Sequence, residues 1–425
     1  MEYELRHSAR KFWIAIAFLG LTTAYLGIVT VHYLAEYFSE SSEESDLILA
    51  TRLDPGDAVS FHNIGRIELL ARARPQAALP WLETATRLNP HMANYWVDLA
   101  LARQAVGETA LERQDLLHAL EASPRTPEIA WQAANLFLAQ GSPDDAMRAF
   151  RLVIENDPPI ASLAIGTCWK VRPDVEFLLN NVIPPNADET FLGFLTSRNQ
   201  PAAATVWEKM YSLRQSISRP HLFEYIRDLV AHQQAAQAAL VWRQAASMAG
   251  LSAYQPSPEN LLVNGDFSLE ILDGGFDWMH QKTRGVNLAL DPNETHSSAR
   301  SLRIIFDGPG IEDAGIRQLV PVEPNTPYEF SAFYKAQEMD GAGGARFALQ
   351  DLYRETSFFM SEELQNSDFW KKVSGSFVTG PETRLLVLRI ARVPAGSPIR
   401  GKLWLDGLLL APSDRRIADD EGKLQ

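Results

Sequence analysis

The hydrophobic pattern along the chain changes twice, and each change marks a different kind of element. Residues 12–34 are predominantly apolar and contain no Asp, Glu, Lys or Arg. From about residue 48 to 250, apolar residues recur every three or four positions, as in helices that bury one face. After residue 260, short runs alternate between apolar and polar residues between glycine-rich turns, which predicts strands. The predicted fold class is therefore multidomain: one apolar helix, an all-α solenoid and an all-β sandwich.

This predominantly apolar segment is long enough to cross a bilayer. At about 1.5 Å of rise per residue, it covers the roughly 30 Å of hydrocarbon in a membrane. Trp13 stands at one end, and Tyr33 and Tyr37 at the other, where interfacial aromatics are common. A cleaved signal peptide is the alternative, but the run is longer than a typical signal core and no small-residue cleavage motif follows it. We therefore predict an uncleaved transmembrane helix over residues 12–35.

The charges that flank this helix predict its direction. The N-terminal residues 1–11 include Arg6, Arg10 and Lys11, whereas the segment 36–47 has acidic residues and no Lys or Arg. Cytoplasmic flanks of membrane helices are enriched in Lys and Arg. We expect a single-pass protein of the inner (cytoplasmic) membrane with a cytoplasmic N-terminus. After an acidic linker, the bulk of the chain would then be periplasmic or otherwise extracytoplasmic.

Prolines recur through the helical region at a nearly constant interval. Pro55, Pro90, Pro124 and Pro158 are separated by 35, 34 and 34 residues, and each closes a similar segment: TRLDP, TRLNP, EASP or ENDP. A small residue, Gly or Ala, stands ten positions after each of the first three. The pattern resembles the tetratricopeptide repeat, in which small residues let two antiparallel helices approach and a proline ends the second helix. The resemblance covers about residues 48–250, and after the last of these prolines it weakens to two degenerate helix pairs.

The tetratricopeptide resemblance implies a concave groove that docks a protein partner. In that family the first helix of each pair lines the groove. Lys and Arg side chains that could clamp a peptide carboxylate are sparse here. For each candidate position, an ordinary surface or inter-helix role is the alternative. By register, the residues expected to face the groove are His62, Arg66, Asn94, Trp131 and Asn135.

A Pro- and Ser-containing segment, residues 251–259, separates the helical region from the strands and predicts a linker. The strings NLLVNGDFSLEILDGGFDW, IRQLVPVEPNTPYEFSAFYKA and KLWLDGLLL follow it. Together they resemble the carbohydrate-binding modules of families 4 and 9, which are galactose-binding-like jelly rolls. The resemblance covers about residues 260–412 and implies two antiparallel sheets packed face to face. We expect residues 413–425 to form a disordered tail, and proteases to cut in the linker.

Side chains alternate between the two sides of a strand, which separates core positions from candidate binding positions. In YEFSAFYKA, Tyr328, Phe330 and Tyr334 are predicted to be buried, which leaves Phe333 on the opposite side. An aromatic ring can stack on a sugar, and cationic or amide side chains can bond its hydroxyl groups. A plain solvated surface is the alternative. The predicted glycan-binding face comprises Phe333, Lys335, Arg346, Gln350 and Arg389.

The same resemblance implies a structural calcium ion between the first and last strands. The matching carboxylates here are Glu270 and Asp406. This sequence departs from the family at Ser268, which follows Phe267 where the family has Glu, and Glu270 is the nearest substitute. Apart from this ion, we expect no cofactor.

The amino-acid composition and the absence of common catalytic motifs argue against several classes of function. The net charge of −14 opposes nucleic-acid binding, which needs clustered Lys and Arg against phosphates. The single cysteine, Cys168, excludes an intramolecular disulfide. The sequence has no H-E-x-x-H, G-x-S-x-G, P-loop or G-x-G-x-x-G motif, so we do not expect an enzyme.

These features predict a membrane-anchored, non-catalytic scaffold of the bacterial cell envelope. By analogy with such architectures, its setting would be the assembly or export of an exopolysaccharide or surface glycan. The repeats would dock a protein, and the jelly roll would bind the polysaccharide. One alternative is a protein-only assembly factor whose jelly roll does not bind sugar. A glycoside-active enzyme is a second alternative, because paired carboxylates cannot be recognised from sequence.

Overall fold

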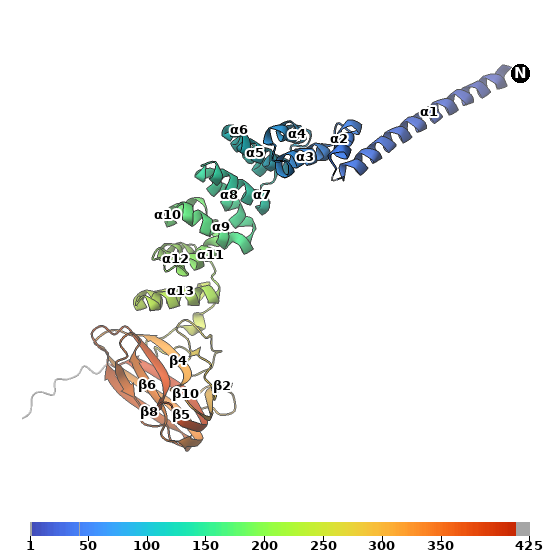
Figure 1. Ribbon diagram of the computed structural model, residues 1–425. Coiled ribbons are helices and arrows are strands. Elements are labelled where there is room, and N and C mark those ends of the chain that lie inside the picture. Colours follow the sequence, from blue (N-terminus) through green and yellow to red (C-terminus); the bar gives the residue numbers. More distant parts are fainter. Residues whose placement is uncertain (1, 42, 414–425) are drawn as a thin grey trace, which may run out of the picture. The chain divides into compact units, whose positions relative to one another are not determined.

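The computed structural model describes residues 2–41 and 43–413 (Figure 1). They form two compact units, one ending at Phe194 and the other beginning at Leu195. Each unit is described by itself below. The predicted tail, residues 413–425, lies outside the described residues apart from Ser413.

The first helix, α1 (Glu2–Ser39), contains the predicted membrane segment. Its residues Arg10–Ser39 have the length and apolar composition of a membrane span, and no other helix among the described residues does. Its apolar side chains are exposed around the whole helix: Phe18 and Leu21, for example, are 71% and 72% exposed. Most of the predicted acidic linker, residues 36–47, is helical instead. It is divided between the end of α1 and the start of α2, where acidic side chains favour the helix N-terminus.

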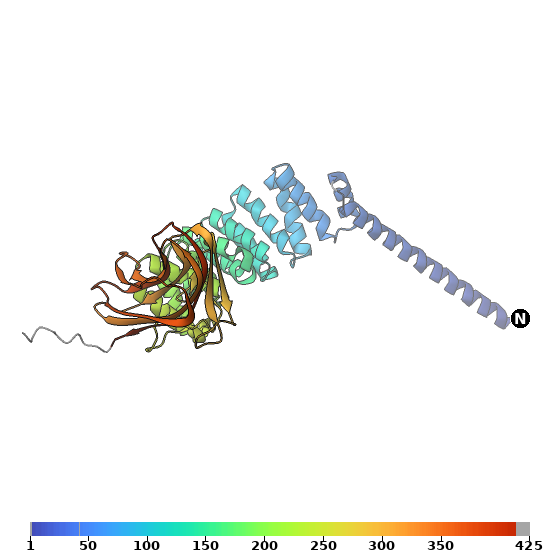
Figure 2. The ribbon, with the colours of Figure 1, turned by 90° about the horizontal axis from the view of Figure 1, so that it is seen from below.

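The first unit continues as a series of short helices joined by tight turns (Figures 1 and 2). Helices α2, α4 and α6 end one residue before the Asp-Pro, Asn-Pro and Ser-Pro steps of the repeated segments, because proline disfavours a helical conformation in the residue before it. The bounds are α2 (Glu44–Leu53), α3 (Ala58–Arg66), α4 (Pro75–Leu88), α5 (Ala93–Val106), α6 (Thr109–Ala122), α7 (Pro127–Ala139), α8 (Pro143–Asn156), α9 (Pro158–Val171), α10 (Val175–Asn181) and α11 (Asp188–Thr196).

Small residues permit the close approach of paired helices. A Cβ atom added to Gly65 on α3 would lie 2.6 Å from the Cδ2 atom of Leu82 on α4, so only glycine fits there. The equivalent Ala100 and Ala134 are fully buried. This packing is compatible with tetratricopeptide repeats. Cys168 on α9 is also fully buried, and burial raises the pKa of its thiol to about 12, which makes it a poor nucleophile.

The second unit begins at Leu195 within α11 and continues with the helices α12 (Ala203–Ser212), α13 (Arg219–Ala231) and α14 (Ala235–Met248). Six helices, α9 to α14, follow Asp157 where the sequence predicts four. Within the predicted linker, Leu251 and Tyr254 are buried, whereas residues 257–259 are exposed. The two compact units divide at residue 194, and the predicted linker stays a prediction. That a domain starting near residue 260 folds alone stays a prediction.

The remainder of this unit is a sandwich of two antiparallel five-stranded sheets, ordered β1-β4-β9-β6-β7 and β2-β3-β10-β5-β8. Its inner side chains match the predicted alternation: Phe330 on β5, Phe347 on β6 and Leu388 on β9 all lie in one core. The bounds are β1 (Met279–His280), β2 (Val286–Asp291), β3 (Ser301–Gly310), β4 (Asp313–Pro321), β5 (Pro327–Gly341), β6 (Gly344–Asp351), β7 (Ser357–Met360), β8 (Ser367–Val378), β9 (Leu385–Val393) and β10 (Pro398–Pro412).

Candidate functional site

The outer face of the sheet β1-β4-β9-β6-β7 carries three of the five residues predicted to bind a glycan. Arg346 and Gln350 lie on β6 and Arg389 on β9, each half-buried and directed away from the core. The Nη2 atom of Arg389 donates a hydrogen bond to Oε1 of Gln350 at 3.1 Å, and Nη1 of Arg346 donates to the carbonyl oxygen of Ser361 at 2.9 Å. The structure therefore brings these three side chains onto one polar surface.

Phe333 and Lys335 lie elsewhere, on the outer face of the other sheet. The ring of Phe333 stacks on His296, with centroids 3.7 Å apart, so the imidazole covers one side of the ring. Nζ of Lys335 lies 2.8 Å from Oε2 of Glu294. The expectation that all five residues share one face is wrong, because β5 belongs to one sheet whereas β6 and β9 belong to the other. Alternation identifies the side of a strand that faces outward but not the sheet that the strand joins.

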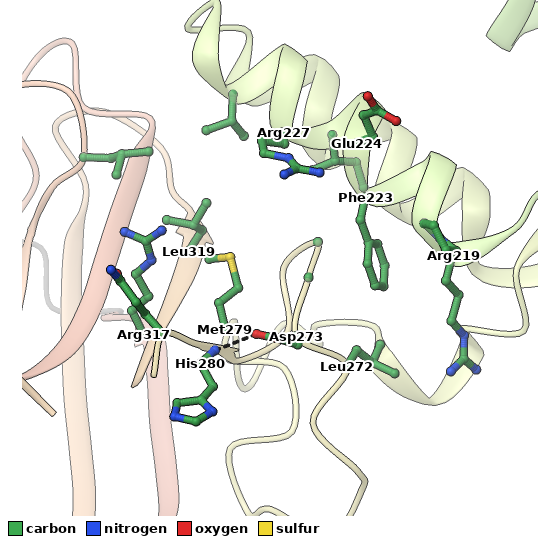
Figure 3. Close-up of a pocket in the computed structure, with 17 residues that line it drawn as sticks. Arg219, Phe223, Glu224, Arg227, Leu272, Asp273, Met279, His280, Arg317 and Leu319 are labelled. Carbon is green, nitrogen blue, oxygen red and sulfur yellow. Dashed lines mark hydrogen bonds between the residues drawn. The ribbon is translucent and has the colours of Figure 1, made fainter. Parts of the chain in front are cut away.

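Helix α13 lies beside the outer face of the sheet β1-β4-β9-β6-β7, and a cleft of about 960 Å³ lies between the helix and this sheet (Figure 3). The helix contributes Arg219, Phe223 and Arg227, and the strands opposite contribute Met279 and Arg317. The loop of residues 272–275 also lines the cleft. The cleft therefore has a helical wall and a sheet wall, both within the second compact unit.

Arginine dominates the polar chemistry of this cleft. The guanidinium groups of Arg219, Arg227 and Arg317 form no hydrogen bond or ion pair with any residue in the described part of the chain, and all three side chains are exposed. Two carboxylates also line the cleft, those of Glu224 and Asp273, and Oδ1 of Asp273 accepts a hydrogen bond from the backbone N–H of His280 at 2.7 Å. Because the arginines are unpaired, they can donate hydrogen bonds to an incoming anion.

Aromatic packing fixes the helical wall to the sandwich. Trp242 on α14 is 1% exposed, and its Nε1 atom donates to the carbonyl oxygen of Tyr254 at 2.9 Å. A Cβ atom added to Gly275 would lie 2.1 Å from the Trp242 ring, and the φ of Gly275 is +64°, so both space and backbone conformation require glycine. At the far end of α13, Oη of Tyr353 donates to the carbonyl oxygen of Val230 at 3.0 Å. The wall is therefore an integral part of the unit.

Residues 259–394 match the family model described as "Carbohydrate binding domain". The C-terminal sandwich is a carbohydrate-binding-module-like domain. The match includes the sheet wall of the cleft and the loop of residues 272–275, but it begins after α13 and α14. A comparison with curated proteins found no match to this chain.

Three solved structures illustrate what the chain is similar to. One described as "CBM4 structure and function" is 15% identical, with a TM-score of 0.28, and covers 36% of this chain and 99% of its own. The xylan-binding CBM22-1 domain of Xyn10C from Paenibacillus barcinonensis is 14% identical, with a TM-score of 0.25, and covers 35% and 91%. MamA is 17% identical, with a TM-score of 0.28, and covers 31% and 77%. At such identities and scores, no property of these proteins transfers to this chain.

In the carbohydrate-binding-module-like domain, the residues expected to hold calcium are engaged by hydrogen-bond donors. Oδ2 of Asp406 accepts from the backbone N–H groups of His296 and Ser297 at 2.7 and 3.1 Å. The carboxylate of Glu270 pairs with Arg300 at 2.5 Å. In the part of the chain that the structure describes, no three His, Cys, Asp or Glu side chains converge as metal ligands. Calcium ligands also include backbone carbonyl oxygens, so calcium binding by Glu270 and Asp406 stays a prediction.

The residues expected in the repeat groove fall into two groups. His62 is 7% exposed, with Nε2 2.7 Å from Oδ2 of Asp98, so it connects α3 to α5 and does not face an open groove. Trp131 is half-buried against Phe150, at 5.5 Å between ring centroids. The remaining three, Arg66, Asn94 and Asn135, are exposed and stay predictions for partner contact.

Sequence reasoning missed the cleft, because its two walls come from separately predicted domains. Arg219 and Arg227 belong to a decayed repeat, and nothing in their spacing indicates that a strand carrying Arg317 stands opposite. The aromatic residues Phe223 and Trp242 were the available signal. Two large apolar side chains at the end of a repeat array indicate that something covers its last helices.

The carboxyl group of Asp277 gives the loop beside the cleft a predicted pH dependence. Asp277 is fully buried, and burial raises its pKa to about 6, although hydrogen bonds from the N–H groups of Leu272 and Trp278 and from Asn264 oppose the shift. Between its unfolded pKa near 4 and about pH 6, the unfolded chain loses this proton first, so stability falls as pH rises. Because of the raised pKa of Asp277, we expect the free energy of unfolding to be about 2–3 kcal/mol lower at pH 7 than at pH 4. Asp277→Asn should remove that part of the slope in urea titrations, and an unchanged slope would contradict the assignment.

Proposed function

We propose that this protein is a membrane-anchored, non-catalytic binding protein whose C-terminal domain holds a glycan. The observation that carries the proposal is the match of residues 259–394 to a carbohydrate-binding family on a sandwich with a polar outer face. On that face Arg346, Gln350 and Arg389 supply donors and an acceptor for sugar hydroxyl groups. The cleft beside them is large enough for several sugar residues.

The remainder of the chain would serve to place and connect this binding site. The basic residues before the membrane segment and the acidic residues after it favour a cytoplasmic N-terminus, with the bulk of the chain after this segment outside the inner membrane. The exposed Arg66, Asn94 and Asn135 are the candidates for docking a protein partner on the repeats. Assembly or export of a surface polysaccharide is the cell-envelope process that suits this combination. Alkaline phosphatase fused after Gln425 should be active, and an inactive fusion would overturn the orientation.

Glycan binding is tested with the full chain in detergent against a panel of bacterial and plant polysaccharides, by affinity electrophoresis. We expect retardation by at least one polysaccharide, and Arg389→Ala should weaken it about tenfold, because a charge-assisted hydrogen bond to the ligand is lost. Lys402→Ala is the matched control, since Lys402 lies on the opposite sheet.

Two outcomes would favour the other functions. If no polysaccharide binds, the protein is an assembly factor whose sandwich does not bind sugar. If the bound polysaccharide yields new reducing ends on incubation, the protein is a glycoside-active enzyme.

A further inference from the structure

We infer that the glycan site is composite: α13 forms its second wall, and arginines from both walls select an anionic polysaccharide. This inference rests on the proposed function and adds two things to it. The first is that the last repeat helices are part of the binding site. The second is the chemical class of the ligand, a polymer that carries carboxylate groups, as polyuronates do.

The geometry of the cleft supports the inclusion of α13 in the binding site. Phe223 and Arg227 of α13 face Met279 and Arg317 of the strands across open space (Figure 3). A Cβ atom on Gly274 would lie 2.2 Å from the Phe223 ring, which shows how closely the loop packs against the helix. A polymer lying along the sheet wall would therefore contact the helix on its other side.

The distribution of charge around the cleft supports an anionic ligand. The whole chain has a net charge of −14, so an average surface of this protein repels anions. Arg219, Arg227 and Arg317 nevertheless gather around one cleft and are not neutralised by ion pairs among the described residues. A planar guanidinium group binds a carboxylate with two parallel hydrogen bonds, and it does so more strongly inside a cleft than in open water.

The apolar lining of the cleft is what distinguishes a sugar polymer from a simple anion. Phe223, Met279 and Leu319 lie among the arginines. Apolar and aromatic side chains pack against the C–H faces of sugar rings, whereas inorganic anions gain nothing from them. An acidic peptide could use the same arginines, and the experiment below separates it from a polysaccharide.

The experiment uses the full chain in detergent and pairs of matched polymers. Alginate, polygalacturonate and hyaluronan are each compared with their carboxyl-reduced forms, which keep the sugar backbone but carry no charge. We expect binding of at least one polyuronate and at least tenfold weaker binding of its reduced form. Arg227→Gln and Arg317→Gln should each weaken polyuronate binding about tenfold. Arg243→Gln is the control, because it removes the same charge from an exposed position on α14 outside the cleft.

Each other result has a defined meaning. If Arg317→Gln weakens binding but Arg219→Gln and Arg227→Gln do not, the helix is not a wall of the site and the composite site is wrong. If carboxyl reduction leaves affinity unchanged, the anionic class is wrong while glycan binding stands. If polyglutamate displaces the polyuronate at equal chain length and charge, the cleft is a peptide site. If no polysaccharide binds, the proposed function itself fails, and this inference with it.

Discussion

Replacing Trp242 by alanine should destabilise the second compact unit by about 3–5 kcal/mol, the usual cost of deleting a large buried aromatic. Trp242 is 1% exposed, donates a hydrogen bond to the carbonyl oxygen of Tyr254, and packs edge-on against Phe276 at 6.0 Å between ring centroids. Its loss removes contacts on both the helical and the sandwich side of the junction. Urea unfolding of the full chain in detergent, followed by circular dichroism, measures the change.

A second measurement locates the effect at the junction. Residues 257–259 are exposed, so limited proteolysis should cut there in the unmodified protein. The two fragments should stay together on size-exclusion chromatography, because Trp242 and Gly275 still pack against each other. In Trp242→Ala they should separate. Trp131→Ala, in the other unit, is the control and should leave the fragments together; association that survives Trp242→Ala would mean that the junction does not depend on this side chain.

Phe330→Ala should cost about 3–5 kcal/mol by leaving a cavity in the sandwich core. Phe330 is 1% exposed and contacts Phe347 and Phe359, each at 5.4 Å between ring centroids. Phe333→Ala removes an aromatic ring three positions along the same strand, but this ring is half-buried on the outer face and stacks on His296. We expect its cost to be about 1–2 kcal/mol.

Thermal melts of the two variants, run beside polysaccharide binding, check both structure and function. Phe333→Ala should leave binding in the cleft within about twofold, because its ring lies on the opposite sheet. Equal destabilisation by the two changes would invert the assignment of inner and outer faces. Loss of polysaccharide binding in Phe333→Ala would instead move the glycan site to the sheet β2-β3-β10-β5-β8.

The fold follows from local patterns that the sequence displays directly. The proline interval predicted the ends of α2, α4 and α6, because proline restricts the residue before it whatever surrounds the helix. Alternation in YEFSAFYKA placed Tyr328, Phe330 and Tyr334 in the core, since a strand has only two sides. The number of late helices was not predictable, because α9 and α10 lack the signature residues of the repeat.

The candidate site depends on long-range pairing, which local patterns do not contain. Strand β5 belongs to one sheet, whereas β6 and β9 belong to the other. Phe333 and Arg389 both point outward, as alternation predicts, but they therefore lie on different faces of the sandwich. Phe223 of α13 packs against Trp242 of α14, and Trp242 in turn fits against a glycine that lies 33 residues farther along the chain, Gly275. Such a fit between one side chain and a distant backbone leaves no periodic signal.

The burial of Cys168 has a practical consequence for studying the cleft. Because the only thiol in the chain is fully buried and has a pKa of about 12, it stays unreactive towards maleimide and methanethiosulfonate reagents in the folded protein. Cysteines introduced by mutation on α13 and β1 would then be the only sites that accept a label. Electron paramagnetic resonance between two spin labels could follow the distance between the walls directly, with no need to remove a native thiol first.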